Sequence, residues 1–248
     1  MRYMIYALLL SAGVTILLGP ALIPLLKRLK FGQCERELGP KSHLTKQGTP
    51  TMGGLMFLFG ILAGTLAFSL SATELVLPAL LCTVGFALVG FLDDFLKVRC
   101  KNTVGLRAYQ KIIAQFLIAA IVAAYAYKSP FIGPKIYLAF SGLEWDLGVF
   151  YIPFIMFVII ATVNSVNLTD GLDGLSSGVT LIYSLTMGVI FLYLATAMKN
   201  PDGMAQAQQT QYAAELQSMG VFAAAVAGGC LGFLRYNSYP ARVFMGDT

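Results

Sequence analysis

The chain has 248 residues, of which 57% are hydrophobic and only 12% are charged. Soluble domains average about 45–50% apolar and about 25% charged residues, so this composition excludes an ordinary soluble protein. The formal net charge of +5 could suit a nucleic-acid-binding protein, but the basic residues are distributed as membrane topology requires, and no nucleic-acid partner is expected.

Long apolar runs account for the excess of hydrophobic residues, and a helix needs about 20 apolar residues to cross the hydrocarbon core of a bilayer. Seven segments meet or approach this length: Tyr3–Leu26, Met52–Leu70, Leu75–Leu92, Ile112–Tyr127, Val149–Val163, Leu175–Ala197 and Met219–Leu234. The gaps between them leave no room for a soluble domain of usual size. The sequence therefore predicts one integral membrane domain over residues 1–248, an all-α bundle of about seven transmembrane helices.

The loop before the second span is polar and basic. Its residues 41–54 include Lys46 and Thr51, together with glycines whose backbone N–H groups are open to a ligand. Cations and backbone donors of this kind are what an anion-binding site needs. An ordinary basic loop on the cytoplasmic side has the same composition, so both interpretations stay open.

The third span ends in the sequence Asp-Asp-x-x-Lys, formed by Asp93, Asp94 and Lys97. Asp93 and Lys97 are four residues apart and share one helix face. Adjacent carboxylates repel each other unless a cation neutralises them, and either Mg²⁺ or Lys97 could be that cation. A helix end with an ordinary ion pair is the alternative interpretation of this motif.

A short segment between the fourth and fifth spans has a strand-like pattern. The apolar run Ile136–Phe140 and the run Leu143–Trp145 flank Ser141-Gly142, which is typical of a β-hairpin turn. We expect a small hairpin outside the bilayer at this point. The polar, glutamine-rich stretch Lys199–Tyr212 is expected to be a loop with some helix.

The fifth span ends in a run of amides and carboxylates. Asn164, Asn167, Asp170 and Asp173 recur at every third position, and a glycine follows each aspartate. This spacing predicts four oxygen-bearing side chains on one stripe of a helix end. Such ligands suit Mg²⁺, which usually keeps water and substrate phosphate in its coordination shell. A capped turn is the alternative, although capping does not need four polar groups in register.

The last stretch of the chain, residues 235–248, contains a third polar group. It supplies an amide at Asn237, an aromatic ring at Phe244 that could stack on a base, and a carboxylate at Asp247.

The basic residues predict the orientation of the bundle. Of the 17 lysines and arginines, only Arg2, Lys128, Lys135 and Lys199 fall on the side opposite the loops that follow spans one, three, five and seven. The positive-inside rule places those loops in the cytoplasm and the N-terminus and the hairpin outside. The aspartates of the motifs above all fall on the cytoplasmic side. An Asp at the centre of a transmembrane helix costs roughly 2.5–3.5 kcal/mol. Aspartates that directly adjoin apolar spans are therefore not expected to serve only as surface charges that keep a protein soluble.

These motifs, in this order, closely resemble the polyprenyl-phosphate N-acetylhexosamine-1-phosphate transferase superfamily, glycosyltransferase family 4. The most specific are Asn-x-x-Asn-x-x-Asp-Gly-x-Asp-Gly at 164–174 and Phe-Met-Gly-Asp at 244–247. Lys97 and the segment Gly-Thr-Pro-Thr-Met-Gly-Gly at 48–54 favour its muramoyl-pentapeptide branch. The family continues beyond this point with further spans and a histidine motif, so the resemblance implies that the C-terminal part of the family domain is missing here.

The resemblance implies a Mg²⁺-dependent transfer of phospho-N-acetylmuramoyl-pentapeptide from its UDP-linked precursor to undecaprenyl phosphate, with release of UMP. The product would be the first lipid-linked intermediate of peptidoglycan synthesis, made for the cell wall. The chain would be a multi-pass protein of the bacterial inner (plasma) membrane whose active site faces the cytoplasm.

The resemblance also implies residue roles. The catalytic residues would be Asp93, Asp94 and Asp247, with the first two at the lipid phosphate and Asp93 as its base. Asp247, with Asn167, would hold Mg²⁺, and Lys97 would neutralise phosphate charge. The remaining substrate-binding residues would be Lys46, Thr51, Asn164, Asp170, Asp173, Asn237 and Phe244.

Three alternatives remain at this stage. A sister transferase would use UDP-N-acetylglucosamine, and a transporter would place its acids near the bilayer midplane rather than at one end. The third concerns assembly, because Gly60-x-x-x-Gly64 and Gly228-x-x-x-Gly232 allow close helix approach. Packing within the chain is favoured over a homodimer face for these glycines.

Overall fold

The computed structural model describes residues 1–29, 49–69, 72–99, 105–138, 141–197 and 206–247. In that part of the chain the elements are α1 (Arg2–Arg28), α3 (Gly54–Phe68), α4 (Val76–Arg99), α5 (Ala108–Lys128), β1 (Lys135–Leu138), β2 (Leu143–Asp146), η1 (Gly148–Phe150), α6 (Tyr151–Thr169), α7 (Leu175–Ala197) and α8 (Gln206–Asn237). Lys46, one of the predicted site residues, lies outside the described residues.

The predicted membrane bundle is confirmed. Each of the seven predicted spans corresponds to one helix, and six of these helices are long and apolar enough to cross a bilayer. The shorter apolar helix is α3, which has 15 residues. The chain is therefore a multi-pass membrane protein built from helices, with one small sheet.

Several helices extend beyond the predicted spans, and α4 and α8 do so where it matters for the site and the loops. The third span continues past Leu92, so that α4 ends at Arg99 and carries the Asp-Asp-x-x-Lys motif on its last turns. The last helix, α8, begins at Gln206 rather than Met219. Its first turns are polar but rich in Gln, Ala and Glu, which are good helix formers, so the expected loop is helical from Gln206 onward.

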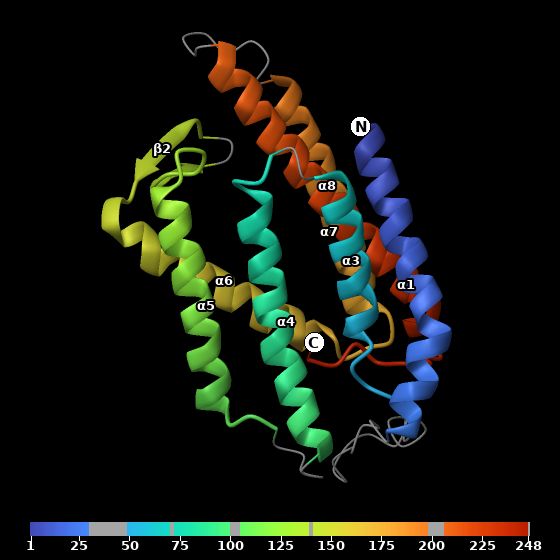
Figure 1. Cartoon of the computed structure of the whole chain (residues 1–248). Coiled ribbons are helices and arrows are strands. Elements are labelled where there is room, and N and C mark those ends of the chain that lie inside the picture. Colours follow the sequence, from blue (N-terminus) through green and yellow to red (C-terminus); the bar gives the residue numbers. More distant parts are fainter. Residues whose placement is uncertain (30–48, 70–71, 100–104, 139–140, 198–205, 248) are drawn as a thin grey trace.

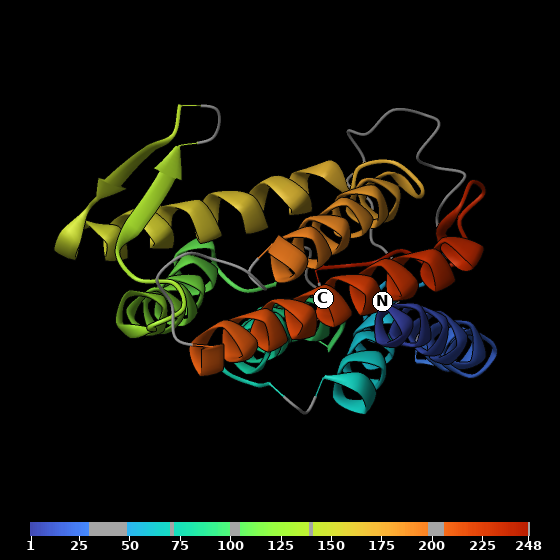
Figure 2. The same ribbon diagram turned by 90° about the horizontal axis from the view of Figure 1, so that it is seen from above.

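The small sheet is the predicted hairpin. Strands β1 and β2 are antiparallel, with Lys135 opposite Asp146 and Leu138 opposite Leu143. The hairpin joins the end of α5 to η1 and the start of α6, and it lies at the edge of the molecule opposite α1 (Figures 1 and 2).

Helices α1, α3 and α8 form the tightly packed part of the bundle. Added methyl groups at Gly60, Gly228 and Gly232 would each collide with α1. Close backbone approach also allows the hydroxyl of Ser11 to donate to the carbonyl oxygen of Ala225 at 2.7 Å, a bond between α1 and α8. Small residues serve here as they do in other membrane helix pairs, and the glycine motifs pack within the chain.

Helix α4 is held at its N-terminus by a buried carboxylate from α8. The Glu215 side chain, 2% exposed, accepts hydrogen bonds from the N–H groups of Glu74 (3.3 Å) and Leu75 (3.0 Å). A carboxylate at this point satisfies free backbone donors and interacts favourably with the helix dipole. This contact limits movement of α4 along its axis, and so helps to position the acidic motif at the other end of the helix.

Candidate active site

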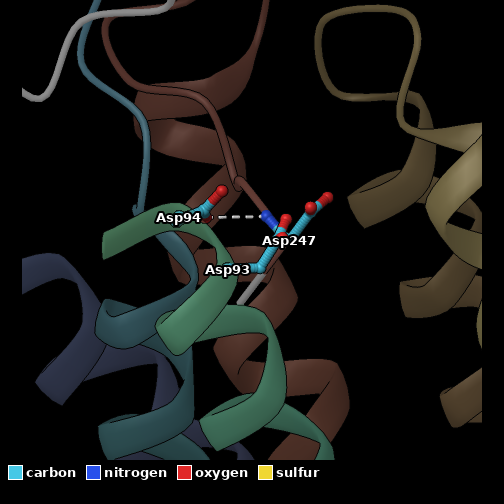
Figure 3. A group of neighbouring side chains, drawn as sticks. All are labelled: Asp93, Asp94 and Asp247. Atoms are coloured by element: carbon cyan, nitrogen blue, oxygen red, sulfur yellow. Dashed lines mark hydrogen bonds between the residues drawn. The ribbon is translucent and has the colours of Figure 1, made fainter. Parts of the chain in front are cut away.

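Three aspartates from distant parts of the chain meet at the C-terminal end of α4. Asp93 and Asp94 lie on α4, and Asp247 lies on the segment that follows α8 (Figure 3). One carboxylate oxygen of each lies within 4.8 Å of the others. The backbone N–H of Asp247 also donates to Oδ2 of Asp94 at 2.8 Å, which fixes the two segments to each other.

The segment that carries Asp247 is held in place by pairing with the residues before α3. Phe244 N–H donates to the Pro50 carbonyl at 2.8 Å, and Gly53 N–H donates to the Phe244 carbonyl at 2.9 Å. Val243, which is fully buried, packs against Met52 in the same region. Residues 50–54 and 243–247 therefore form one scaffold beneath the acidic cluster.

Gly246 lets the chain reach Asp94. Its φ of +81° lies in the left-handed region, and an added Cβ would collide with Oδ2 of Asp94 and lie 2.8 Å from Oγ1 of Thr51. Thr51 itself is buried beside this turn. Any side chain at position 246 would therefore push Asp247 away from α4.

Two lysines balance part of the negative charge. The ammonium of Lys97 lies 2.6 Å from Oδ2 of Asp93 and 2.7 Å from Oδ2 of Asp247. Lys111, on the first turn of α5, lies 3.3 Å from the same oxygen of Asp247. From the sequence, Lys111 is only one of the 17 basic residues that indicate the orientation of the bundle. The sequence feature that could have identified Lys111 as a site residue is its position at the start of the span that directly follows the Asp-Asp-x-x-Lys motif.

The side chains of the amide and carboxylate run at the end of the fifth span lie next to different parts of the chain. Helix α6 ends at Thr169, so the predicted stripe of four side chains does not form. A step of three residues also turns about 60° away from one helix face, because the helix has 3.6 residues per turn. Of the four, Asn167 reaches the cluster and donates to Oδ1 of Asp247 at 2.8 Å.

The other members of that run lie around the cluster. Asn164, one turn earlier on α6, donates to Oε1 of Gln115 on α5 at 3.0 Å. Asp173 accepts a hydrogen bond from Ala241 N–H at 3.1 Å, which joins the α6–α7 turn to the segment after α8. Asp170 lines a cavity together with Asp247.

Asn237 joins the same two segments from inside the protein. Its side chain is 1% exposed, accepts from Gly174 N–H at 3.0 Å and donates to the Val243 carbonyl at 3.0 Å. Asn237 is therefore a buried residue that holds the α6–α7 turn and the segment after α8 together. Phe244 is half-buried and contributes its backbone to the scaffold.

The electrostatics of the cluster favour a further cation. Burial, with the charges of Asp247 and Asp173, raises the pKa of Asp170 to about 6. Burial is the largest single influence on Asp247 and would raise its pKa, but hydrogen bonds with Asp93, Lys97 and Asn167, together with the charge of Lys111, lower it overall. Carboxylate oxygens suit Mg²⁺, and oxygens on opposite sides of that ion are about 4.2 Å apart, twice the usual Mg–O distance. The spacing of the three aspartates is compatible with one shared ion.

A mainly apolar cavity of about 480 Å³ opens beside the acidic cluster. Its walls come from α3, α4, α5 and α6, including Phe57, Phe86 and Val163. Its polar lining includes Lys111, Asn167 and Asp247. A molecule with an apolar chain and a charged head would find both kinds of surface here.

The sequence is similar to a family of known enzymes. The profile described as Glycosyl transferase family 4 matches residues 76–248, and the profile described as Phospho-N-acetylmuramoyl-pentapeptide-transferase signature 1 matches residues 46–58. The phospho-N-acetylmuramoyl-pentapeptide-transferase of Clostridioides difficile is 45% identical over 98% of this chain and 69% of the relative. Those of Thermoanaerobacter pseudethanolicus (46%, over 100% and 71%) and Desulfitobacterium hafniense (44%, over 96% and 69%) are similarly close.

The Gly246 turn gives a direct test of this geometry. We expect Gly246→Ala to lower the free energy of unfolding by about 1–2 kcal/mol or more, because a left-handed residue with a Cβ is strained and the methyl group meets Asp94. Gly13→Ala is the matched control, since nothing lies within 4 Å of its added Cβ. Thermal unfolding in detergent micelles, followed by circular dichroism, compares the two. Equal unfolding temperatures would show that the turn is not constrained as described.

Proposed function

The chain belongs to glycosyl transferase family 4 and, within it, to the phospho-N-acetylmuramoyl-pentapeptide-transferases, and on this premise we propose how its own residues carry out the transfer. The donor is the UDP-linked muramoyl-pentapeptide and the acceptor is undecaprenyl phosphate. The products are UMP and the first lipid-linked intermediate of peptidoglycan synthesis.

The observation that carries this proposal is the meeting of Asp93, Asp94 and Asp247 beside an apolar cavity. Phosphoryl transfer asks a protein chiefly to position two phosphates and to stabilise the charge that develops between them. A cluster of acids and lysines can do both if a divalent cation joins them. The cavity beside the cluster gives an isoprenoid chain apolar walls while its phosphate stays at the charged end.

We propose Mg²⁺ as the cation, held by Asp247 and Asn167 together with the carboxylates of α4. When bound, it would neutralise the diphosphate of the nucleotide and ease departure of UMP. The donor set fits, because the side chains that converge here offer oxygen atoms and the region carries more acids than lysines.

The lysines and Asp93 complete the reaction. Lys111, from the cavity wall, would contact the phosphate of the lipid, and Lys97 would balance charge between the two substrates. Asp93 would accept the proton of the lipid phosphate, whose oxygen then attacks the phosphorus attached to the sugar. One P–O bond forms to the lipid phosphate, the P–O bond to UMP breaks, and UMP leaves with the electron pair.

The nucleotide would bind at the edge of the cluster where Asp170 lines the mouth of the cavity and the α6–α7 turn meets the segment after α8. Asp173 and Phe244 lie in these two segments, and Asn237 and Thr51 support them from within. We propose that this side faces the cytoplasm of a bacterial inner membrane. Support comes from the basic loops, which the positive-inside rule places there, and from the availability of nucleotides on that side.

Removal of single carboxylates tests the catalytic cluster. We expect Asp94→Asn and Asp247→Asn to lower the rate of transfer by about 10²–10³ or more, the usual effect of removing a group that stabilises developing charge. The measurement is release of UMP by membranes that contain the protein, with either UDP-N-acetylmuramoyl-pentapeptide or UDP-N-acetylglucosamine as donor. EDTA should stop the reaction and added Mg²⁺ should restore it.

Membrane insertion and helix content of both variants serve as controls and should not change. Wild-type turnover in both variants would contradict the site assignment. A preference for UDP-N-acetylglucosamine would leave the site in place but overturn the donor.

Lys111 provides a separate test of the acceptor side. We expect Lys111→Met to raise the KM for the lipid phosphate by about tenfold or more, because a hydrogen bond to a charged group contributes about 1.5–3 kcal/mol. The KM for the nucleotide donor should change much less. Lys128→Met, at the exposed opposite end of α5, is the matched control. An equal rise in both KM values would place Lys111 at the donor instead.

A further inference from the structure

The β1–β2 hairpin has one polar and one apolar face. Residues opposite each other in an antiparallel pair project to the same side, and neighbours along a strand project to opposite sides. The observed register therefore puts Lys135, Tyr137, Glu144 and Asp146 on one face, and Ile136, Leu138, Leu143 and Trp145 on the other. An ion pair of 3.3 Å between Lys135 and Glu144 lies on the polar face.

The apolar face is exposed on β2, whereas Ile136 and Leu138 on β1 are partly buried by the described part of the chain. Leu143 is 57% exposed and Trp145 is 59% exposed. The exposed apolar surface continues into η1, where Val149 and Phe150 are more exposed still. An isolated two-stranded hairpin is marginally stable in water, so this face needs a partner.

The base of the hairpin is fixed to the bundle at the end away from the acidic cluster. Tyr212, near the start of α8, donates to the carbonyl of Phe131 at 2.6 Å and packs against its ring. Lys111, beside the acidic cluster, and Lys128, at the base of the hairpin, are separated by about 25 Å along α5 at 1.5 Å per residue. The hairpin therefore lies at the ends of α5 and α6 that are remote from the acidic cluster (Figure 1).

We propose that the apolar face of this hairpin is seated in the headgroup layer of the bilayer on the side opposite the acidic cluster, with Trp145 as its anchor. Two constraints are satisfied together only at that depth. The apolar face is unfavourable in water, at roughly 25 cal/mol per Å² of exposed apolar surface. The open edges of a two-stranded sheet carry unpaired backbone groups, which exclude it from the hydrocarbon core.

The composition of the hairpin agrees with an interfacial position. Tryptophan is enriched at the headgroup level, where its amphipathic ring contacts both lipid and water. Lys135 and Glu144, on the other face, remain in water or among headgroups. The surface is also continuous with the lipid-facing side of α6, on which Phe154 and Phe157 are exposed. The anchor would fix the depth of α6, whose other end carries Asn167.

The chain contains one tryptophan, so its fluorescence reports on Trp145 alone. The whole chain is reconstituted in phosphatidylcholine–phosphatidylglycerol vesicles whose acyl chains carry bromine either near the headgroup or near the terminal methyl. Iodide, present on both sides of the membrane, probes exposure to water. We expect the shallow bromines to quench about twofold more strongly than the deep ones, because indole prefers the interface, and iodide to quench weakly.

A double variant, Trp145→Phe with Tyr137→Trp, is the matched control because it moves the single tryptophan to the polar face of the same hairpin. It should be quenched strongly by iodide and weakly by both lipids, with unchanged helix content by circular dichroism. Equal access of iodide to Trp145 and to the control position would overturn the proposal. Quenching of Trp145 by neither lipid nor iodide would mean that protein covers the face, and stronger quenching by deep bromines would place it in the core. Both results would also overturn the proposal.

Discussion

Three carboxylates that repel one another are gathered at one end of a membrane helix, and the structure depends on how this repulsion is balanced. Two unit charges 4 Å apart interact by about 4 kcal/mol at the effective dielectric of a protein surface, so Asp93, Asp94 and Asp247 repel one another strongly when all three are ionised. Lys97 and Lys111 supply part of the compensation. The remaining negative charge makes the cluster suited to a divalent cation, and the segments around it hold these three groups together against their repulsion.

The two halves of the bundle contribute differently to that task. Small residues let α1, α3 and α8 pack closely, and the segment after α8 returns from this rigid half to reach α4. Helices α4, α5 and α6 form most of the wall of the apolar cavity, and α3 closes it on the side of the tightly packed half. The acids therefore lie on the boundary between a fixed support and a space suited to a lipid chain. A transferase that moves a phosphosugar from a water-soluble nucleotide to a lipid phosphate needs this boundary at the membrane surface.

Hydropathy predicted the seven helices and the hairpin, because spans and turns are local features of the sequence. The family resemblance assigned the three aspartates to one site, but other contacts between distant segments were beyond such reasoning. The role of Lys111 depends on the fold that brings α5 beside Asp247, and the buried amide of Asn237 depends on the return of the segment after α8. The three-residue spacing of the amide run suggested one stripe, but the helix ends at Thr169 and the later side chains face other partners. The start of α8 was misplaced because hydropathy does not detect helix formers that are polar.

The most direct test of the shared cation site is the binding of Mn²⁺, used as a paramagnetic substitute for Mg²⁺ and followed by electron paramagnetic resonance on the purified protein. The account predicts one bound ion per chain at the acidic cluster, with an affinity that falls by about tenfold or more in Asp247→Asn, since a charge-assisted ligand contact is lost. Absence of a bound ion, or an unchanged affinity in that variant, would contradict the claim that these aspartates hold a metal together.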